Sequence, residues 1–319
     1  MDRLANPRRW SMALLLLAAL AVVSVLLFVR VSKTEIELEA TVEGLRFRLA
    51  TGQALTEPAS LAFLGVAGIG RAELSGDTLP PALQGDTLAL HADALDAACS
   101  GRLSLEPLVL PPSTLVGLGE PSAGRLSMQL ESPGDMWLRV VIDGCVRIGT
   151  ARGSVWPGTT RTLLLKLADR ADLGLGPAAG QRLRFARWVP VDELRLARVE
   201  QIAHDGDLMV RHVSTLGAGR LYYMALDGRE RVLRVAEPLR FREVAGEFRS
   251  IAVDGDRIEL RFRGDVRGME SGSESHGRSW MPSWLEWLKA NHAVSLLWAS
   301  VLSLFGLLLS LRNWWRGGP

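Results

Sequence analysis

The stretch Thr34–Leu49, which reads TEIELEATVEGLRFRL, decides the fold class of this chain. Its apolar residues recur at every second position and are separated mainly by charged or polar residues. They are Ile36, Leu38, Ala40, Val42, Leu45, Phe47 and Leu49. Successive side chains of a β-strand point to opposite faces of a sheet, so this period of two predicts strands with one buried face and one face in water.

The same period recurs along most of the chain, as far as about Val266. Alternating runs occur at Arg125–Leu130, Trp137–Ile142, Thr162–Leu167, Leu208–Val213, Arg231–Val235 and Arg257–Phe262. Asp-Gly pairs lie between such runs and favour tight hairpin turns, because both central residues of these turns need a positive φ. These pairs begin at Asp143, Asp205, Asp227 and Asp254. Many short strands joined by turns predict a mainly β fold, β-sandwich-like, with either one domain or two.

A turn-rich stretch, Asp172–Gly180, offers a boundary inside this β-rich region. We therefore expect one β-rich subdomain over residues 32–170 and a second over residues 181–267. Residues 268–282 follow and contain several Gly and Ser residues, which is typical of a flexible linker.

The N-terminal end carries 19 uncharged, mostly apolar residues, Ser11–Val29. At about 1.5 Å per residue, a helix of this length spans roughly 28 Å, close to the hydrocarbon thickness of a bilayer. A cleaved signal peptide is the alternative, but its apolar region is shorter and ends at small residues. Here the run leaves through the bulky segment Phe28–Val31. We expect an uncleaved signal-anchor, with a transmembrane helix over residues 11–31.

The C-terminal end carries a second run of 19 uncharged residues, Ala293–Leu311. Ahead of it, Ser283 and Glu286 have the spacing of a capping box, which predicts a helix start near Trp284. We expect an interfacial and transmembrane helix over residues 283–311. Indole rings favour membrane interfaces, and tryptophans flank this run on both sides. The predicted interfacial belt consists of Trp280, Trp284, Trp287, Trp314 and Trp315.

The charges at the two ends predict the orientation. The short tails, residues 1–10 and 312–319, both carry arginine, and positively charged tails tend to stay in the cytoplasm. The β domain would then lie outside the cytoplasm, in the periplasm or at the cell exterior, on the inner (plasma) membrane. Four basic residues on the domain side weaken this asymmetry, namely Arg30, Lys33, Arg278 and Lys289.

One face of the second apolar run is lined by small residues spaced three or four apart: Ser295, Ala299, Ser303, Gly306 and Ser310. Small residues in a stripe let helix backbones approach closely, and they mark packing faces in bilayers. Two partners for this face stay open: the first helix of the same chain, or a second copy or partner subunit.

The two cysteines, Cys99 and Cys145, permit one disulfide at most. An exported domain would allow that bond, because only oxidising compartments sustain disulfides. Two buried free thiols are the alternative.

The known motifs of cofactor and metal sites are not matched convincingly. A G-x-G-x-x-A pattern begins at Gly174, but Pro177 interrupts it and the next segment alternates like a strand, whereas a dinucleotide site needs a helix there. His204, Asp207 and His212 lie around a predicted Asp-Gly turn, and a zinc site needs three or four convergent ligands. We therefore expect no cofactor, no metal site and no catalytic residues.

The sequence predicts a membrane-anchored binding protein rather than an enzyme. The net charge of +2 gives no general attraction to nucleic acid. The expected role is a binding, scaffold or assembly subunit of a cell-envelope complex. Its expected partners are membrane lipid and either another envelope protein or a second copy bound through the second helix, with a glycan as a further candidate. The alternatives are an oligomeric sensor or pore-forming subunit, and a membrane-anchored hydrolase with a dispersed site.

Overall fold

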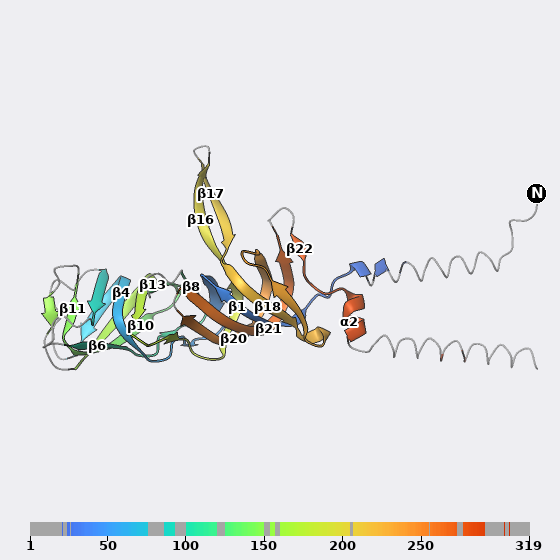
Figure 1. The fold of residues 1–319 in the computed structure, drawn as a ribbon. Coiled ribbons are helices and arrows are strands. Elements are labelled where there is room, and N and C mark those ends of the chain that lie inside the picture. Colours follow the sequence, from blue (N-terminus) through green and yellow to red (C-terminus); the bar gives the residue numbers. More distant parts are fainter. Residues whose placement is uncertain are drawn as a thin grey trace, which may run out of the picture.

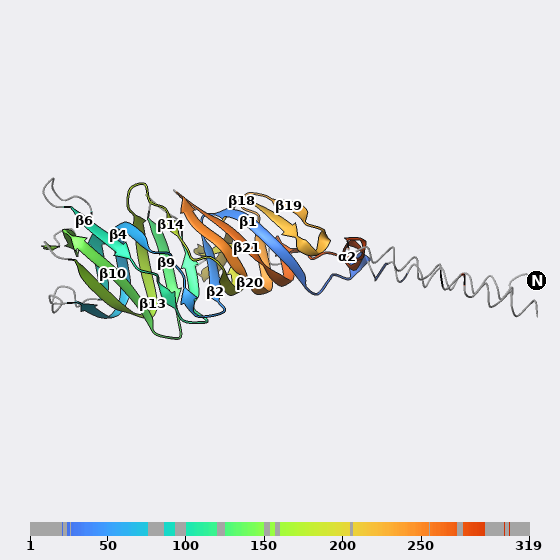
Figure 2. The same cartoon turned by 90° about the horizontal axis from the view of Figure 1, so that it is seen from below.

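The structure is a computed structural model, and it describes most of the region between the two apolar runs. The described residues are 21, 24–25, 27–75, 86–92, 100–119, 125–149, 154–156, 160–204, 207–254, 256–272, 277–290, 303 and 306. Side-chain statements exclude residues 154–156 and 199–212. The described body is elongated, and the segments next to the two apolar runs meet at one of its ends (Figures 1 and 2).

The chain is mainly β, as its alternating pattern predicts. The strands of the first half are β1 (Thr34–Val42), β2 (Leu45–Leu49), β3 (Gln53–Ala54), β4 (Ala59–Leu74), β5 (Thr87–His91), β6 (Gly101–Leu105), β7 (Val109–Leu110), β8 (Leu115–Leu118), β9 (Leu126–Glu131), β10 (Met136–Gly144), β11 (Val146–Ile148) and β12 (Ser154–Trp156). Those of the second half are β13 (Arg161–Pro177), β14 (Leu183–Arg184), β15 (Val189–Arg195), β16 (Ala197–His204), β17 (Asp207–Ser214), β18 (Leu216–Tyr223), β19 (Arg229–Leu233), β20 (Leu239–Asp254), β21 (Arg257–Ser271) and β22 (Arg278–Ser279). A short 3-10 helix, η2 (Met224–Leu226), and the helix α2 (Trp284–Ala290) complete the described elements.

The alternation of the sequence becomes an alternation of burial. In β1 every second side chain is buried and the others are half-buried. The same pattern continues through β2. Because strands of one sheet share their buried face, these positions combine into a single apolar core.

Long antiparallel strands build the end of the body farthest from α2. β4 pairs with β13 along most of its length, while the other edge of β13 pairs first with β10 and then with β9. β10 also pairs with β6, and β6 pairs back onto β4. β4, β13, β10 and β6 therefore form a closed ring of strand pairs.

The end nearest α2 is formed by strands from both extremes of the sequence. β1 lies between β18 and β21, and β21 continues through β20 to β15. β15 then pairs with β2, and β2 connects through β8 to β9 of the far end. All these strands belong to one large antiparallel sheet.

The strand pairing crosses the predicted division into residues 32–170 and 181–267, which stays a prediction. β1 and β2 belong to the first range by sequence, yet they pair with strands of the second range. β13 also runs without interruption through the predicted boundary as far as Pro177. Within the described residues, the strand pairing does not divide the chain into two domains, nor does it divide the large sheet into the two sheets of a sandwich.

The predicted linker, residues 268–282, is also largely structured where it is described. β21 continues to Ser271, and β22 returns along it at Arg278–Ser279. Trp280 and Met281 are buried in the core. The Gly and Ser content predicted flexibility, but pairing along the edge of β21 holds both ends of this segment.

One hairpin stands apart from the large sheet. β16 and β17 pair only with each other, from Ala197 opposite Ser214 to His204 opposite Asp207. Figure 1 shows this hairpin projecting from the side of the body.

Within the described residues, no helix is long and apolar enough to cross a membrane. The predicted spans at residues 11–31 and 283–311, and both tails, fall largely outside those residues. The flanking transmembrane helices therefore stay predictions.

Three phenylalanines form the centre of the core near α2. The Phe47 and Phe248 ring centroids lie 4.9 Å apart, and those of Phe248 and Phe262 lie 5.8 Å apart, each pair edge to face. Two glycines, Gly246 and Gly264, face each other across β20 and β21 beneath the Phe262 ring. A Cβ atom on Gly246 would lie 2.5 Å from the Arg263 carbonyl oxygen and 2.6 Å from the Phe262 ring. The pair therefore has to be glycine for the strands and the ring to approach this closely.

We expect Gly246→Ala to lower the free energy of unfolding by about 1–3 kcal/mol, because the added methyl group overlaps backbone that cannot move freely. Gly70→Ala is the matched control, since its Cβ would meet one oxygen at 3.6 Å, an ordinary contact. Urea unfolding of the full chain in detergent measures both. Equal stability of the two variants would contradict the close packing described here.

Candidate binding site at the base of the domain

The base of the domain is the place where the chain enters and leaves it, formed by residues 29–31 and 280–290. The Val31 amide donates to the Pro282 carbonyl at 2.9 Å, and the Trp284 amide donates to the Val29 carbonyl at 3.1 Å. Arg30 and Ser283 form an antiparallel bridge between these two bonds. The residues that follow the first apolar run are thus tied directly to those that precede the second.

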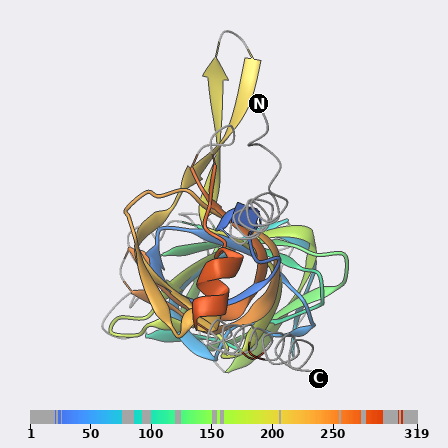
Figure 3. The same cartoon turned by 90° about the vertical axis from the view of Figure 1, so that its right-hand side faces the viewer.

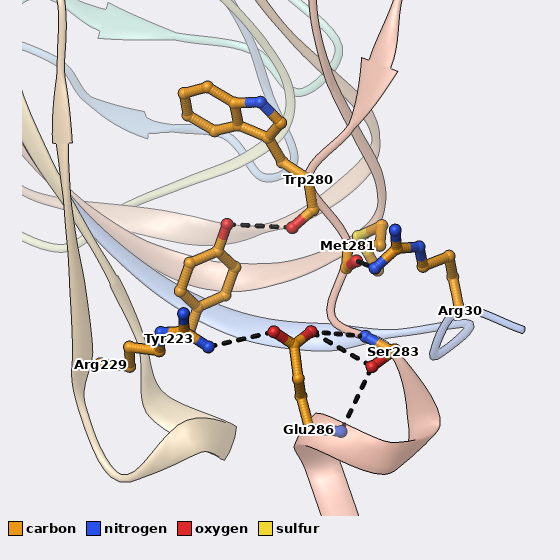
Figure 4. A network of polar contacts seen from close by, with 7 residues as sticks. All are labelled: Arg30, Tyr223, Arg229, Trp280, Met281, Ser283 and Glu286. Carbon is orange, nitrogen blue, oxygen red and sulfur yellow. Dashed lines mark hydrogen bonds and ion pairs between the residues drawn. The ribbon is translucent and has the colours of Figure 1, made fainter. Parts of the chain in front are cut away.

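The helix α2 begins at Trp284, as the capping-box spacing predicts. The Glu286 amide donates to Ser283 Oγ at 3.2 Å, and the Ser283 amide donates to Glu286 Oε2 at 3.0 Å. Glu286 also accepts a charge-assisted hydrogen bond from Arg229 of β19 at 3.1 Å. The Ser283 backbone bond is the main cause that holds the pKa of Glu286 below its ordinary value, against the opposing effect of burial. Figures 3 and 4 show α2 lying over this end of the body and the polar contacts at its start.

A buried tyrosine joins β18 to the segment before α2. The Tyr223 hydroxyl donates to the Trp280 carbonyl at 2.9 Å, and both residues are buried (Figure 4). Burial raises the pKa of Tyr223, while the charge of Arg231 acts in the opposite direction. The Arg231 guanidinium lies 3.4 Å above the centroid of the Trp280 ring, a cation–π contact.

These elements enclose a pocket of about 320 Å³, which we call the base pocket. Its charged lining consists of Arg30, Arg229, Arg231, Arg278, Glu230 and Glu286. Four cations against two carboxylates leave the pocket positively charged. Guanidinium groups present planar pairs of N–H donors that match the oxygen pairs of phosphate and carboxylate groups. The arrangement is therefore suited to binding an anion.

Two other hollows on the described surface lack this excess of charge. One of about 410 Å³ lies over β1, β18 and β21, and its charges are matched in pairs such as Arg261 with Glu39 at 3.0 Å. The other, of about 280 Å³, lies where β2, β8 and β9 meet the start of β16. It is lined by several glycines and one glutamate with two arginines. The base pocket is the stronger candidate because its cations outnumber its carboxylates by two.

The predicted interfacial tryptophans fall into three groups. Trp284 is 37% exposed, and its ring packs edge to face against the half-buried Trp287, with centroids 5.4 Å apart. Trp280 is only 5% exposed, so it belongs to the core rather than to a surface belt, because the segment before α2 folds inward beneath β19. Trp314 and Trp315 lie outside the described residues.

Two members of the predicted helix-packing stripe are described, Ser303 and Gly306. Both are helical and exposed, and open space lies around the position of a Cβ on Gly306. Ser295, Ala299 and Ser310 lie outside the described residues.

Cys145 follows the Asp143-Gly144 turn at the end of β10 and is buried in a disulfide bond. Cys99, the only other cysteine of the chain, lies outside the described residues. Of His204, Asp207 and His212 the structure describes the backbone alone, and Asp205 and Gly206 lie outside the described residues. Among the residues whose side chains it describes, no group of three or more His, Cys, Asp or Glu could hold a metal ion.

The base pocket was not predicted as a site from the sequence. Arg30 and Arg278 entered the sequence argument only as charges that weaken the orientation signal, and Arg231 only as the first residue of an alternating run; Arg229 did not enter it. The four residues come from three distant segments, so no local spacing connects them. The one available signal was the position of Arg30 and Arg278 close to the two apolar runs.

No family model, curated protein or solved structure matches this chain, so the interpretation of the base pocket rests on its own geometry.

We expect Glu286→Gln to weaken hydrogen-exchange protection at the start of α2 at neutral pH, because the charged bonds to Ser283 and Arg229 are lost. The pKa of Glu286 is lowered in the folded protein, so its stabilising effect is complete above the ordinary value of 4.5 and disappears as the pH falls through the lower, folded value. Wild type and variant should therefore converge in acid. Hydrogen exchange of residues 280–290, followed by mass spectrometry between neutral pH and about pH 3, measures this.

Glu230→Gln is the matched control, because Glu230 lines the same pocket but pairs at 3.5 Å with Arg220 outside it. Its protection at α2 should equal that of the wild type. A Glu286→Gln effect that persists unchanged in acid would show that the carboxylate charge is not its cause.

Proposed function

We propose that this chain is a doubly membrane-anchored envelope protein whose β domain acts as a binding and scaffold subunit, without catalysis of its own. The observation that carries this proposal is the pairing of Val29–Val31 with Pro282–Trp284 at the base. Two apolar runs that leave the domain from hydrogen-bonded neighbours would enter a bilayer side by side. Both tails would then lie on the same side of it.

The exposed side chains just before the base support an anchoring role. Phe28 is 82% exposed and Val25 is 57% exposed, and both lie on a helical segment at the end of the first apolar run. Large apolar side chains gathered at such exposure are unfavourable in water and favourable in lipid. Together with the arginine-bearing tails, they support an inner (plasma) membrane location with the domain outside the cytoplasm.

The body has features of a scaffold. All its strands except β16 and β17 form one continuous sheet. A mechanical force applied at the far end would therefore reach the base through backbone hydrogen bonds. The β16–β17 hairpin projects from that body (Figure 1), and within the described part of the chain its outer edges have no strand partner. Exposed edges of this kind accept an additional strand from another protein. We infer that the hairpin docks an extended segment of a second envelope protein, with a glycan as the alternative ligand of the domain.

The carboxylates of the base pocket favour binding over catalysis. Glu286 is occupied by the cap of α2 and by Arg229, and Glu230 pairs with Arg220. A general base needs a carboxylate free to accept a proton from a substrate. These two carboxylates have structural partners instead.

A shortened hairpin tests the docking role. The variant replaces residues 200–211 with Asn-Gly, which joins the paired residues Val199 and His212 by a tight turn. We expect thermal unfolding to be unchanged, because the hairpin shares no ladder with the large sheet. Cross-linking in intact cells followed by purification of the full chain should lose the envelope protein that the wild type captures. Asp256→Ala, in the exposed turn of another hairpin, is the control that should retain it.

Self-association through the second apolar run is a further candidate role, consistent with an oligomeric sensor or pore subunit. Among the described residues, nothing lies within 4 Å of a Cβ placed on Gly306, and a small-residue face of this kind can admit a second helix. We expect Gly306→Leu to abolish dimer formation, measured by cross-linking in membranes, since the larger side chain prevents close approach. Leu308→Phe, which ideal helix geometry of 3.6 residues per turn would place about 200° away from Gly306, should have no effect. Unchanged assembly of Gly306→Leu would exclude the stripe as the contact face.

A further inference from the structure

Three arginines of the base pocket have no carboxylate partner among the described residues. They are Arg30, Arg231 and Arg278. Arg30 donates to the Met281 carbonyl at 3.1 Å, which fixes its position but does not neutralise its charge (Figure 4). Arg231 stacks on the Trp280 ring and also hydrogen-bonds the Tyr223 side chain, and the remaining N–H donors at the edge of a stacked guanidinium stay available.

The negative groups of the pocket are already engaged. Glu286 bonds to Ser283 and Arg229, and Glu230 pairs with Arg220. The unpaired charge of the pocket is therefore positive. It is concentrated around one small cavity and is not spread along a strand. Elsewhere on β1 and β21, by contrast, arginines pair with glutamates across the strands, as Arg263 does with Glu35 at 2.7 Å.

The position of the pocket identifies the anion. Arg30 is the first charged residue after the apolar run 11–29, and Pro282 and Glu286 lie 11 and 7 residues before Ala293, where the second run begins. If these runs span a bilayer, the pocket lies at the level where lipid headgroups begin. A volume of about 320 Å³ is at the low end of the range for small-molecule pockets, about 300–1,000 Å³, and accommodates a phosphate with a short polar group.

We propose that the base pocket binds the phosphate of an anionic phospholipid headgroup through Arg30, Arg231 and Arg278. The bound lipid links the underside of the β domain to the bilayer between the two spans. This inference rests on the proposed membrane anchoring. A free phosphate ion shares the same recognition chemistry, and the experiment separates the two sources.

The test uses the full chain purified in a neutral detergent and measures binding by native mass spectrometry and by thermal unfolding. The probes are short-chain phosphatidylglycerol, phosphatidylcholine of the same chain length, and inorganic phosphate. Arg231→Gln with Arg278→Gln is the pocket variant. Arg102→Gln with Arg147→Gln is the matched control, because β6 and β11 lie at the opposite end of the body and the loss of charge is the same (Figures 1 and 2).

The wild type and the control should bind phosphatidylglycerol with equal affinity, and the pocket variant should bind it about tenfold or more weakly, since charge-assisted bonds to phosphate are lost. Phosphatidylcholine should bind weakly to all three. Equal phosphatidylglycerol affinity of the pocket variant and the control overturns the proposal. Inorganic phosphate that binds as tightly as the lipid also overturns it, because the ligand would then be a free anion.

The single variant Arg278→Gln controls for misfolding of the double variant. Within the described residues, no hydrogen bond or ion pair of the Arg278 guanidinium stabilises the fold. The single variant should weaken phosphatidylglycerol binding with an unchanged unfolding temperature, and Arg278→Lys should recover part of the loss. Unaltered binding in Arg278→Gln contradicts the assignment of this residue.

A separate measurement distinguishes failure of this inference from failure of the proposed anchoring. Asp256→Cys in intact cells should react with a membrane-impermeant thiol reagent, and the wild-type chain should resist alkaline extraction from membranes. If both hold while lipid preference is absent, the pocket assignment alone is wrong. If the chain is extracted by alkali, the anchoring itself is wrong.

Discussion

The pairing of β1 with β21 is the interaction on which the rest of the structure depends. It joins Thr34–Val42 to Ile258–Val266 along nine consecutive residue pairs, with β18 on the other edge of β1. Because β1 starts just after the base and β21 leads back to it, this one ladder brings the two ends of the domain together. The bonds between Val29–Val31 and Pro282–Trp284 then follow, and so does the meeting of arginines from the start of the chain, from β19 and from β22. The base pocket therefore forms because this ladder brings the three segments together.

The local features of the fold could be predicted from the sequence, and the non-local ones could not. The period of two identified strands as different as β1, β13 and β21, because residues two apart in a strand point to the same face of the sheet and are buried together. Of the predicted Asp-Gly turns, those beginning at Asp205, Asp227 and Asp254 lie between paired strands, whereas Asp143-Gly144 ends β10 and leads to β11, which pairs elsewhere. Local turn chemistry reverses the chain but does not choose the partner strand. The division near Asp172–Gly180 was drawn from local turn content alone, which carries no information that β1 pairs with a strand in the last third of the sequence.

The candidate site shows the same limit at the level of single residues. Ser283 and Glu286 could be placed because a capping box is a relationship within four residues. Trp280 was assigned to the membrane interface, and its burial depends on Tyr223 and Arg231, both about 50 residues earlier. An indole suits a headgroup layer and a protein core equally well, so its neighbours decide. Arg30 lies just before the first strand, Arg229 and Arg231 lie on β19, and Arg278 lies on β22, and only the meeting of these three segments turns the four arginines into a site.

The β1–β21 ladder also fixes the order in which the domain can be completed during synthesis. Its two strands lie more than 200 residues apart in sequence. At about 5–20 residues per second, β1 waits roughly 10–40 s after it is made before its partner exists. Through that interval it carries an unpaired edge and an exposed apolar face, the state in which strands aggregate. The β1–β21 ladder can therefore form only after nearly the whole domain has been made, shortly before the second apolar run is synthesised.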